Sequence, residues 1–183
     1  MSANPIQPVA QSGTYGPGGQ ALPGRTPTRA IVLWLFVAVL FDLLPWHDMR
    51  GIPDLVSLAI LFWAIHESRR VNVGSAFFLG LLMDAANGVL IGQHALAYSV
   101  LAYGGIVLSR RVLGFGLWAQ AVHVVLLLLL NQILLLILGM AAGGTFPGWS
   151  YFIGCLSAAA LWPVLSLLHQ LGEQAREHPT TPH

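Results

Sequence analysis

The sequence predicts an all-α integral membrane protein, built as a bundle of six transmembrane helices, and three observations predict it. First, 56% of the 183 residues are hydrophobic and only 8% are charged, whereas a soluble domain carries about a quarter of its residues as charges. Second, six apolar runs of helical length follow one another. Third, the arginines stand where six crossings would gather them on one side. The runs span residues 30–44, 53–65, 73–90, 94–108, 116–140 and 149–169.

The apolar runs differ in length. At about 1.5 Å per residue, runs 53–65 and 94–108 are short for a hydrocarbon core of about 30 Å, so they need the rest of the bundle or a thinner bilayer around them. Run 116–140 gives the strongest prediction, because residues 124–130 are all aliphatic. None of the runs alternates with period two, as a strand of an outer-membrane barrel would.

The arginines test the number of crossings. Six crossings place all of them but Arg50 on one side, which the positive-inside rule assigns to the cytoplasm. Five crossings would split them between the two sides. We therefore expect six spans with both termini cytoplasmic. The arginines on the cytoplasmic side are Arg25, Arg29, Arg69, Arg70, Arg110, Arg111 and Arg176.

The two ends of the chain differ in composition from its middle. Residues 1–28 are rich in Gly, Pro, Gln and Ser, which predicts a disordered cytoplasmic tail. Residues 29–170 form the predicted transmembrane domain, and residues 171–183 form a short cytoplasmic tail. The first apolar run has no small-residue cleavage site, so we expect it to stay in the membrane rather than act as a signal peptide.

Three acidic residues, Asp42, Asp54 and Asp84, fall at the outer ends of the first three predicted helices. An ionisable group in lipid is costly, so each should face the bundle interior, water or a hydrogen-bond donor. Asp54 follows Pro53 at the start of a run, where a carboxylate caps free N–H groups. We interpret Asp42, which can reach the interface, and Asp54 as structural acids. A proton relay through the three acids is the alternative.

Asp84 also belongs to a pattern of small residues. Ala76, Gly80, Asp84 and Gly88 follow at four-residue steps, which places them on one face of a helix. Small residues let two helix backbones approach closely, so this face should contact another helix. At that contact Asp84 fixes the pairing, carries a proton, or serves folding alone.

The run 116–140 carries a polar stripe. Gln120 and Asn131 are eleven residues apart and therefore point in nearly the same direction, with His123 close in angle. Such a stripe lines a solute path, binds the transmembrane helix of a partner, or forms hydrogen bonds within the bundle, which is the commonest use.

Catalytic patterns are missing from the sequence. There is no GxSxG, HExxH, Walker or CxxC motif, and no metal-ligand spacing. We expect neither enzyme activity nor a metal or other cofactor. Cys155 is interpreted as a small packing residue, and a formal charge of +1 gives no field for binding nucleic acid.

Two stretches, residues 53–70 and 80–98, resemble the MreD family of bacterial rod shape-determining proteins. The resemblance is most specific in the second to fourth predicted helices, and the order of helices extends it over most of residues 30–168. The matching positions are Pro53, Asp54, Gly80, Asp84, Gly92, Gln93, Ala95, Leu96 and Tyr98.

This resemblance implies a non-enzymatic scaffold in the bacterial inner membrane. Such a scaffold belongs to the cell-elongation machinery, which keeps cells rod-shaped and regulates peptidoglycan synthesis. The implied partner is an MreC-like single-pass membrane protein with a periplasmic domain. That partner would connect the scaffold to the MreB filament, the RodA glycosyltransferase and a class B penicillin-binding transpeptidase. On this hypothesis, the helix around Asp84 and the polar stripe help to capture a partner helix.

The alternative hypothesis is a membrane-embedded substrate-binding subunit of a vitamin-type transporter, because the fold of the resembled family looks similar to those subunits. They dock through alanines at every fourth position of their first helix. Here Ala30 is followed at that spacing by Trp34, and Ala38 by Asp42, which disfavours the transporter.

Overall fold

The computed structural model describes residues 27–44 and 53–177. Each of the predicted helices is present there, and no strand is formed in these residues. The helix ends differ from the predicted ones by up to eight residues, because the last helix continues to Glu177. The predicted tail 1–28 and Arg50 lie mostly or wholly outside the described residues. The elements are α1 (Thr28–Asp42), α2 (Leu55–His66), α3 (Val73–Asn87), α4 (Gln93–Leu113), α5 (Leu117–Ala141), η1 (Trp149–Phe152) and α6 (Ile153–Glu177).

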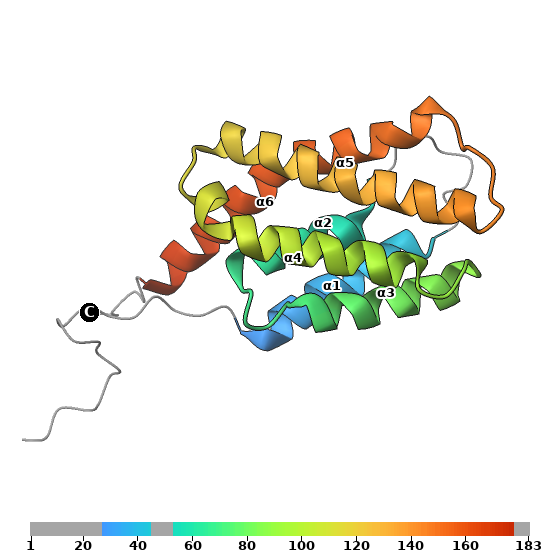
Figure 1. Cartoon of the computed structure of the whole chain (residues 1–183). Helices are drawn as coiled ribbons and strands as arrows, with labels where there is room; N and C mark the ends of the chain where they lie inside the picture. Colours follow the sequence, from blue (N-terminus) through green and yellow to red (C-terminus); the bar gives the residue numbers. More distant parts are fainter. Residues whose placement is uncertain (1–26, 45–52, 178–183) are drawn as a thin grey trace, which may run out of the picture.

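Helix α2 forms the centre of the bundle. It contacts α1, α4, α5 and α6, and Figure 1 shows it behind α4. Every residue from position 56 to 65 is buried, although the helix has only 12 residues. This explains why such a short apolar run suffices, because other helices rather than lipid surround it. A helix that is apolar on all sides is expected at such a position.

Helix α4 is longer than the run 94–108 that predicts it. It continues to Leu113 and has 21 residues, because Arg110 and Arg111 form its last turn instead of following it. Both arginines are exposed, and cations are favourable near a helix C-terminus. The expectation of a short fourth helix is therefore wrong. Among the described residues, three helices are long and apolar enough to cross a membrane: Gln93–Leu113, Leu117–Ala141 and Trp149–Gly172.

Helix α3 is shorter than predicted at its C-terminal end. It begins with a capping box between Asn72 and Ser75 and ends at Asn87. Gly88 follows in the left-handed conformation with φ 63°, which glycine adopts without strain and which commonly ends a helix. Gly88 therefore does not extend the small-residue face as the spacing predicted. Ala76, Gly80 and Asp84 do share a buried face.

The small-residue face of α3 packs closely against α4. A Cβ atom added at Gly80 would lie 2.4 Å from the Cα of Ala95. This distance is far below van der Waals contact, so only glycine fits at position 80. The approach of the two backbones fixes how α3 and α4 cross.

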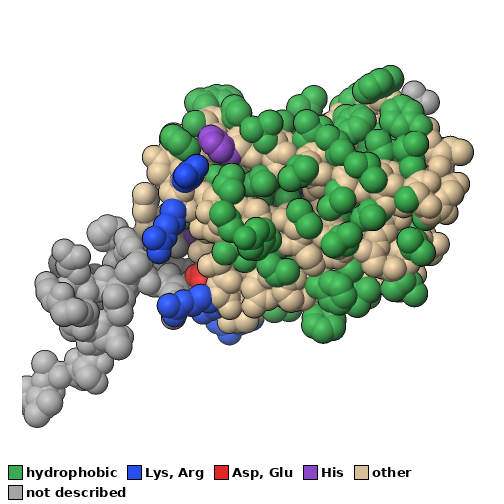
Figure 2. Space-filling view, viewed as in Figure 1, with side chains coloured by type: hydrophobic (Ala, Val, Ile, Leu, Met, Phe, Trp, Pro, Cys, Tyr) green, Lys and Arg blue, Asp and Glu red, His purple; other side chains and the backbone are tan. Residues whose placement is uncertain are grey.

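The surface is typical of a protein surrounded by lipid. Large apolar side chains are exposed around the bundle, for example Phe78, Trp118 and Val122, and Figure 2 shows them spread over the visible face. The described arginines gather at one end of the bundle in the same view. Helix α1 begins and helix α6 ends at that end as well (Figure 1). Helices of this composition and surface identify a helical membrane protein.

Replacing Gly80 with alanine should destabilise the bundle. The added methyl group meets the α4 backbone, and overpacking of this kind costs about 1–3 kcal/mol. Gly172→Ala is the matched control, since a Cβ at this α6 position meets nothing within 4 Å. We expect a lower thermal unfolding temperature for Gly80→Ala in detergent and an unchanged or higher one for Gly172→Ala. Equal behaviour of the two variants would contradict the close contact.

Candidate functional site

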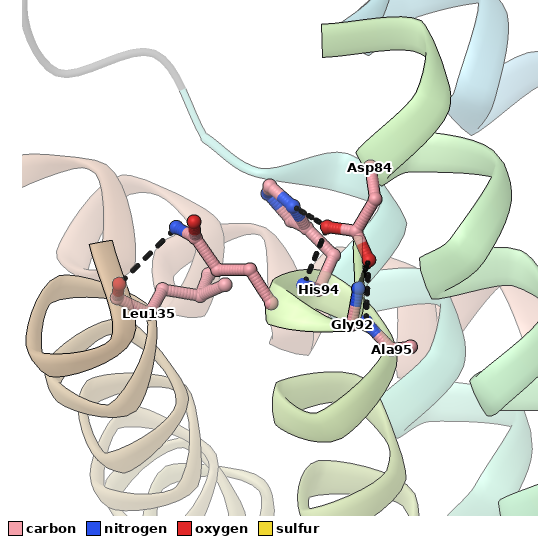
Figure 3. A network of polar contacts seen from close by, with 6 residues as sticks. Asp84, Gly92, His94, Ala95 and Leu135 are labelled. Atoms are coloured by element: carbon pink, nitrogen blue, oxygen red, sulfur yellow. Dashed lines mark hydrogen bonds and ion pairs between the residues drawn. The ribbon is translucent and has the colours of Figure 1, made fainter. Parts of the chain in front are cut away.

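Asp84 holds the first turn of α4. Its carboxylate accepts hydrogen bonds from the backbone N–H groups of Gly92 at 2.8 Å, His94 at 2.7 Å and Ala95 at 3.3 Å. The ring Nδ1 of His94 lies 2.8 Å from the same carboxylate. Figure 3 shows the four contacts converging on one side chain. Asp84 therefore caps a helix that is not its own.

The local sequence makes this cap possible. Gly88 ends α3 and Gly92, at φ 106°, begins α4, so the chain reverses within a few residues. The reversal brings the free N–H groups of α4 to the end of α3. A buried carboxylate that accepts several N–H hydrogen bonds at a helix N-terminus is well compensated. The sequence predicted that Asp84 lies at a helix contact, but not that His94 pairs with it.

Other residues of the sequence resemblance lie around this corner. Ala95 is buried against Gly80, and Tyr98 is buried one turn further along α4. The side-chain amide of Gln93 donates to the backbone oxygen of Leu135, which links α4 to α5 (Figure 3). Leu96 differs from these, because it is exposed on the outside of the bundle. Apart from Pro53 and Asp54 at the start of α2, the resemblance therefore follows the α3–α4 corner.

Two further carboxylates bind the first turn of α2. Asp54 accepts from the backbone N–H of its own helix at Ser57, and also from the Ser57 hydroxyl. Asp42, at the end of α1, accepts from Leu55 N at 3.3 Å and Val56 N at 2.9 Å. The sequence predicted the cap by Asp54. The Asp42 contact joins α1 to α2 across thirteen residues or more, which no local pattern reveals.

The two buried amides of α5 bind other helices of the bundle. Asn131 donates to the hydroxyl of Ser57 on α2 at 3.0 Å. Gln120 accepts from the indole N–H of Trp162 on α6 at 3.2 Å. His123 lies apart from them, stacked on Phe115 and bonded to the preceding turn. Hydrogen bonds within the bundle thus use both polar side-chain atoms of Gln120 and the side-chain nitrogen of Asn131.

A polar cavity of about 520 Å³ lies among these groups, and we call it the outer cavity. It borders the start of α2, whereas Arg69 and Arg70 follow the end of that helix. It therefore lies toward the bundle end opposite the arginines. Its polar lining consists of Asp42, Asp54, Ser57, Asn87, His94, Tyr98, Asn131, Gln132, Ser150 and Tyr151.

A second hollow has a different character. It is an apolar groove of about 360 Å³ between α1, α2 and α6, and it shares no lining residue with the outer cavity. Its lining includes Val37, Phe62, Val164 and Leu168. Val164 and Leu168 are more than half exposed, so the groove faces the surroundings of the bundle.

No catalytic arrangement emerges from these groups. The described residues hold no group of three or more His, Cys, Asp or Glu side chains that would bind a metal ion. The single cysteine, Cys155, is buried and its thiol is bonded to the Phe152 carbonyl. The carboxylates at the helix starts bind backbone N–H groups, which is a structural task.

Removing the Asp84 carboxylate should destabilise the α3–α4 corner. Asp84→Leu leaves three backbone N–H groups without an acceptor, so we expect a loss of about 3 kcal/mol or more. His94→Phe removes only the ring contact and should cost about 1 kcal/mol. Thermal unfolding in detergent measures both. If Asp84→Leu unfolded at the same temperature as the natural chain, Asp84 would not be the cap of α4.

Comparison with known proteins bears on this arrangement. The family model described as rod shape-determining protein MreD matches residues 26–171. The Rod shape-determining protein MreD of Haemophilus influenzae is 27% identical over 164 residues, which cover 82% of this chain and 99% of that protein. No solved structure matches significantly. The family match covers α1 to α5 and α6 as far as residue 171, so this chain belongs to the MreD family of rod shape-determining proteins.

Proposed function

We propose that this chain is a non-enzymatic scaffold of the bacterial cell-elongation machinery in the inner membrane. Its family is defined by a role in cell shape. The gathering of the described arginines at one end of the bundle supports six crossings with both termini cytoplasmic. A scaffold needs a stable bundle and a surface for partners, and no catalytic group.

The observation that carries the proposal is the apolar groove between α1, α2 and α6. Lipid chains do not drive helices together, so partner helices need shape and close packing. The groove offers both, since the small, buried residues Ala38 and Ala59 lie among larger side chains in its lining. We propose that the transmembrane helix of an MreC-like single-pass protein lies in this groove.

The residues that the sequence suggested for partner capture contribute indirectly on this proposal. Ala76, Gly80 and Asp84 face α4, and Gln120 and Asn131 face other helices of the same bundle. They shape the bundle and so hold the walls of the groove in place. A bound MreC-like protein would then connect the bundle to the MreB filament, the RodA glycosyltransferase and a class B penicillin-binding transpeptidase, and so regulate peptidoglycan synthesis.

A bulky residue in the groove should block the partner helix. Val164 lines the groove and is 54% exposed, whereas Val122 on α5 is 59% exposed and lies outside it. We expect Val164→Trp to lower co-purification of an MreC-like partner by about tenfold or more, a loss equivalent to roughly 1.4 kcal/mol. Val122→Trp should leave it unchanged. The amount of each variant in the membrane fraction controls for insertion, and equal co-purification would exclude the groove.

The outer cavity favours a second candidate, a membrane-embedded substrate-binding subunit of a vitamin-type transporter. Small-molecule sites commonly have volumes of about 300–1,000 Å³, and the outer cavity falls in that range. Native mass spectrometry of the purified chain distinguishes the two functions. A vitamin-sized molecule bound at one copy per chain would support the transporter subunit, and its absence together with loss of partner binding by Val164→Trp would support the scaffold.

A further inference from the structure

Ser57 lies on the lining of the outer cavity, and its hydrogen bonds have a fixed order of donor and acceptor. The Ser57 hydroxyl donates its single proton to Asp54, so it must accept from Asn131 Nδ2. This order turns the amide oxygen of Asn131 away from Ser57. Asn131 is 4% exposed, and its Oδ1 has no hydrogen-bond partner among the described residues. A buried acceptor on the cavity lining is therefore left without a donor.

The charge of the described lining residues is also unbalanced. Asp42 and Asp54 both bind the first turn of α2. When the pair carries one negative charge, a helix N-terminus offsets only about half of it. The described lining contains no arginine, and the chain has no lysine. The lining histidine, His94, is paired with Asp84.

Two nitrogen donors of the lining already have acceptors. Gln132 Nε2 donates to the Tyr151 carbonyl at 2.6 Å, and His94 Nδ1 is bound to Asp84. Neutral water does not offset the remaining negative charge in surroundings of low polarity. A ligand that supplies both N–H donors and a positive charge satisfies the two deficits together.

We propose that the outer cavity binds a guanidinium or ammonium group, between the Asp42 and Asp54 carboxyl groups and the free oxygen of Asn131. The group comes from a basic side chain of a partner protein, at the outer surface of the inner membrane, or from a free organic amine. This site is independent of the apolar groove, because the two share no lining residue.

Two small probes of matched shape test the chemistry. Propylguanidinium carries a positive charge and several N–H donors, whereas propylurea has a similar shape and no charge. Binding to the full chain in detergent at low salt is followed by isothermal titration calorimetry and by the unfolding temperature at probe concentrations far below denaturing ones. We expect saturable binding of propylguanidinium, about tenfold or more tighter than that of propylurea.

Three variants locate the site. Asn131→Leu has a side chain of similar size without the free oxygen, and Asp42→Asn keeps an acceptor but removes the charge. Each should weaken propylguanidinium binding by about tenfold or more. Gln120→Leu is the matched control, because Gln120 is also a buried amide of α5 but bonds with both its oxygen and its nitrogen. It should lower the unfolding temperature and leave binding unchanged.

Further measurements distinguish the sources of the group. A basic side chain of the partner is the source if the complex with an MreC-like partner no longer binds propylguanidinium, and if replacing outer arginines or lysines of the partner by glutamine restores binding. A free amine is the source if native mass spectrometry finds one on the chain purified from membranes.

Three outcomes would overturn the proposal. If propylguanidinium binds only after Arg50→Gln, the cationic group is supplied by this chain itself and not by a ligand. Equal binding of both probes, or binding that Asn131→Leu leaves intact, also overturns it.

Discussion

Backbone N–H groups at the start of a membrane helix must find acceptors without water, and this constraint organises the bundle. Here carboxylates from the end of one helix bind the start of the next. Asp42 of α1 binds the first turn of α2, and Asp84 of α3 binds the first turn of α4. Each carboxylate gives acceptors to the N–H groups it binds, and each contact fixes where two helices meet. Together with the close approach at Gly80, they fix α1 against α2 and α3 against α4.

The central helix α2 is subject to the same constraint. With all of positions 56 to 65 buried, it needs partners on every side, and most of its contacts are apolar. Its polar exception, Ser57, lies where Asp54 and Asn131 converge and joins α2 to α5. Among the described residues, hydrogen bonds between helices are therefore few. They lie near the helix ends or among buried side chains. The remaining stability comes from side-chain packing, as expected where lipid competes for apolar contacts.

The two hollows of the bundle differ because different parts of the helices border them. The apolar groove follows faces of α1, α2 and α6 whose side chains are mostly apolar. The outer cavity lies beside the helix ends, where the capping carboxylates and the Asn131 amide collect. On the proposed function, the bundle would offer a transmembrane helix an apolar surface and a cationic group an acceptor-lined one. The two surfaces can be altered separately, because their residues do not overlap.

The sequence by itself determined the membrane environment, the helices, the family, the common side of the arginines, the cap by Asp54 and the contact face of Ala76 and Gly80. All of these follow from composition or from spacing within one segment. Only the tertiary structure decided that Asp42 binds α2, that His94 joins Asp84, that Gly88 ends α3, and that Asn131 leaves an acceptor free in a cavity. Helical periodicity states which side chains share a face, but not which distant residue meets that face. That pairing depends on how the helices cross, which the whole set of contacts determines.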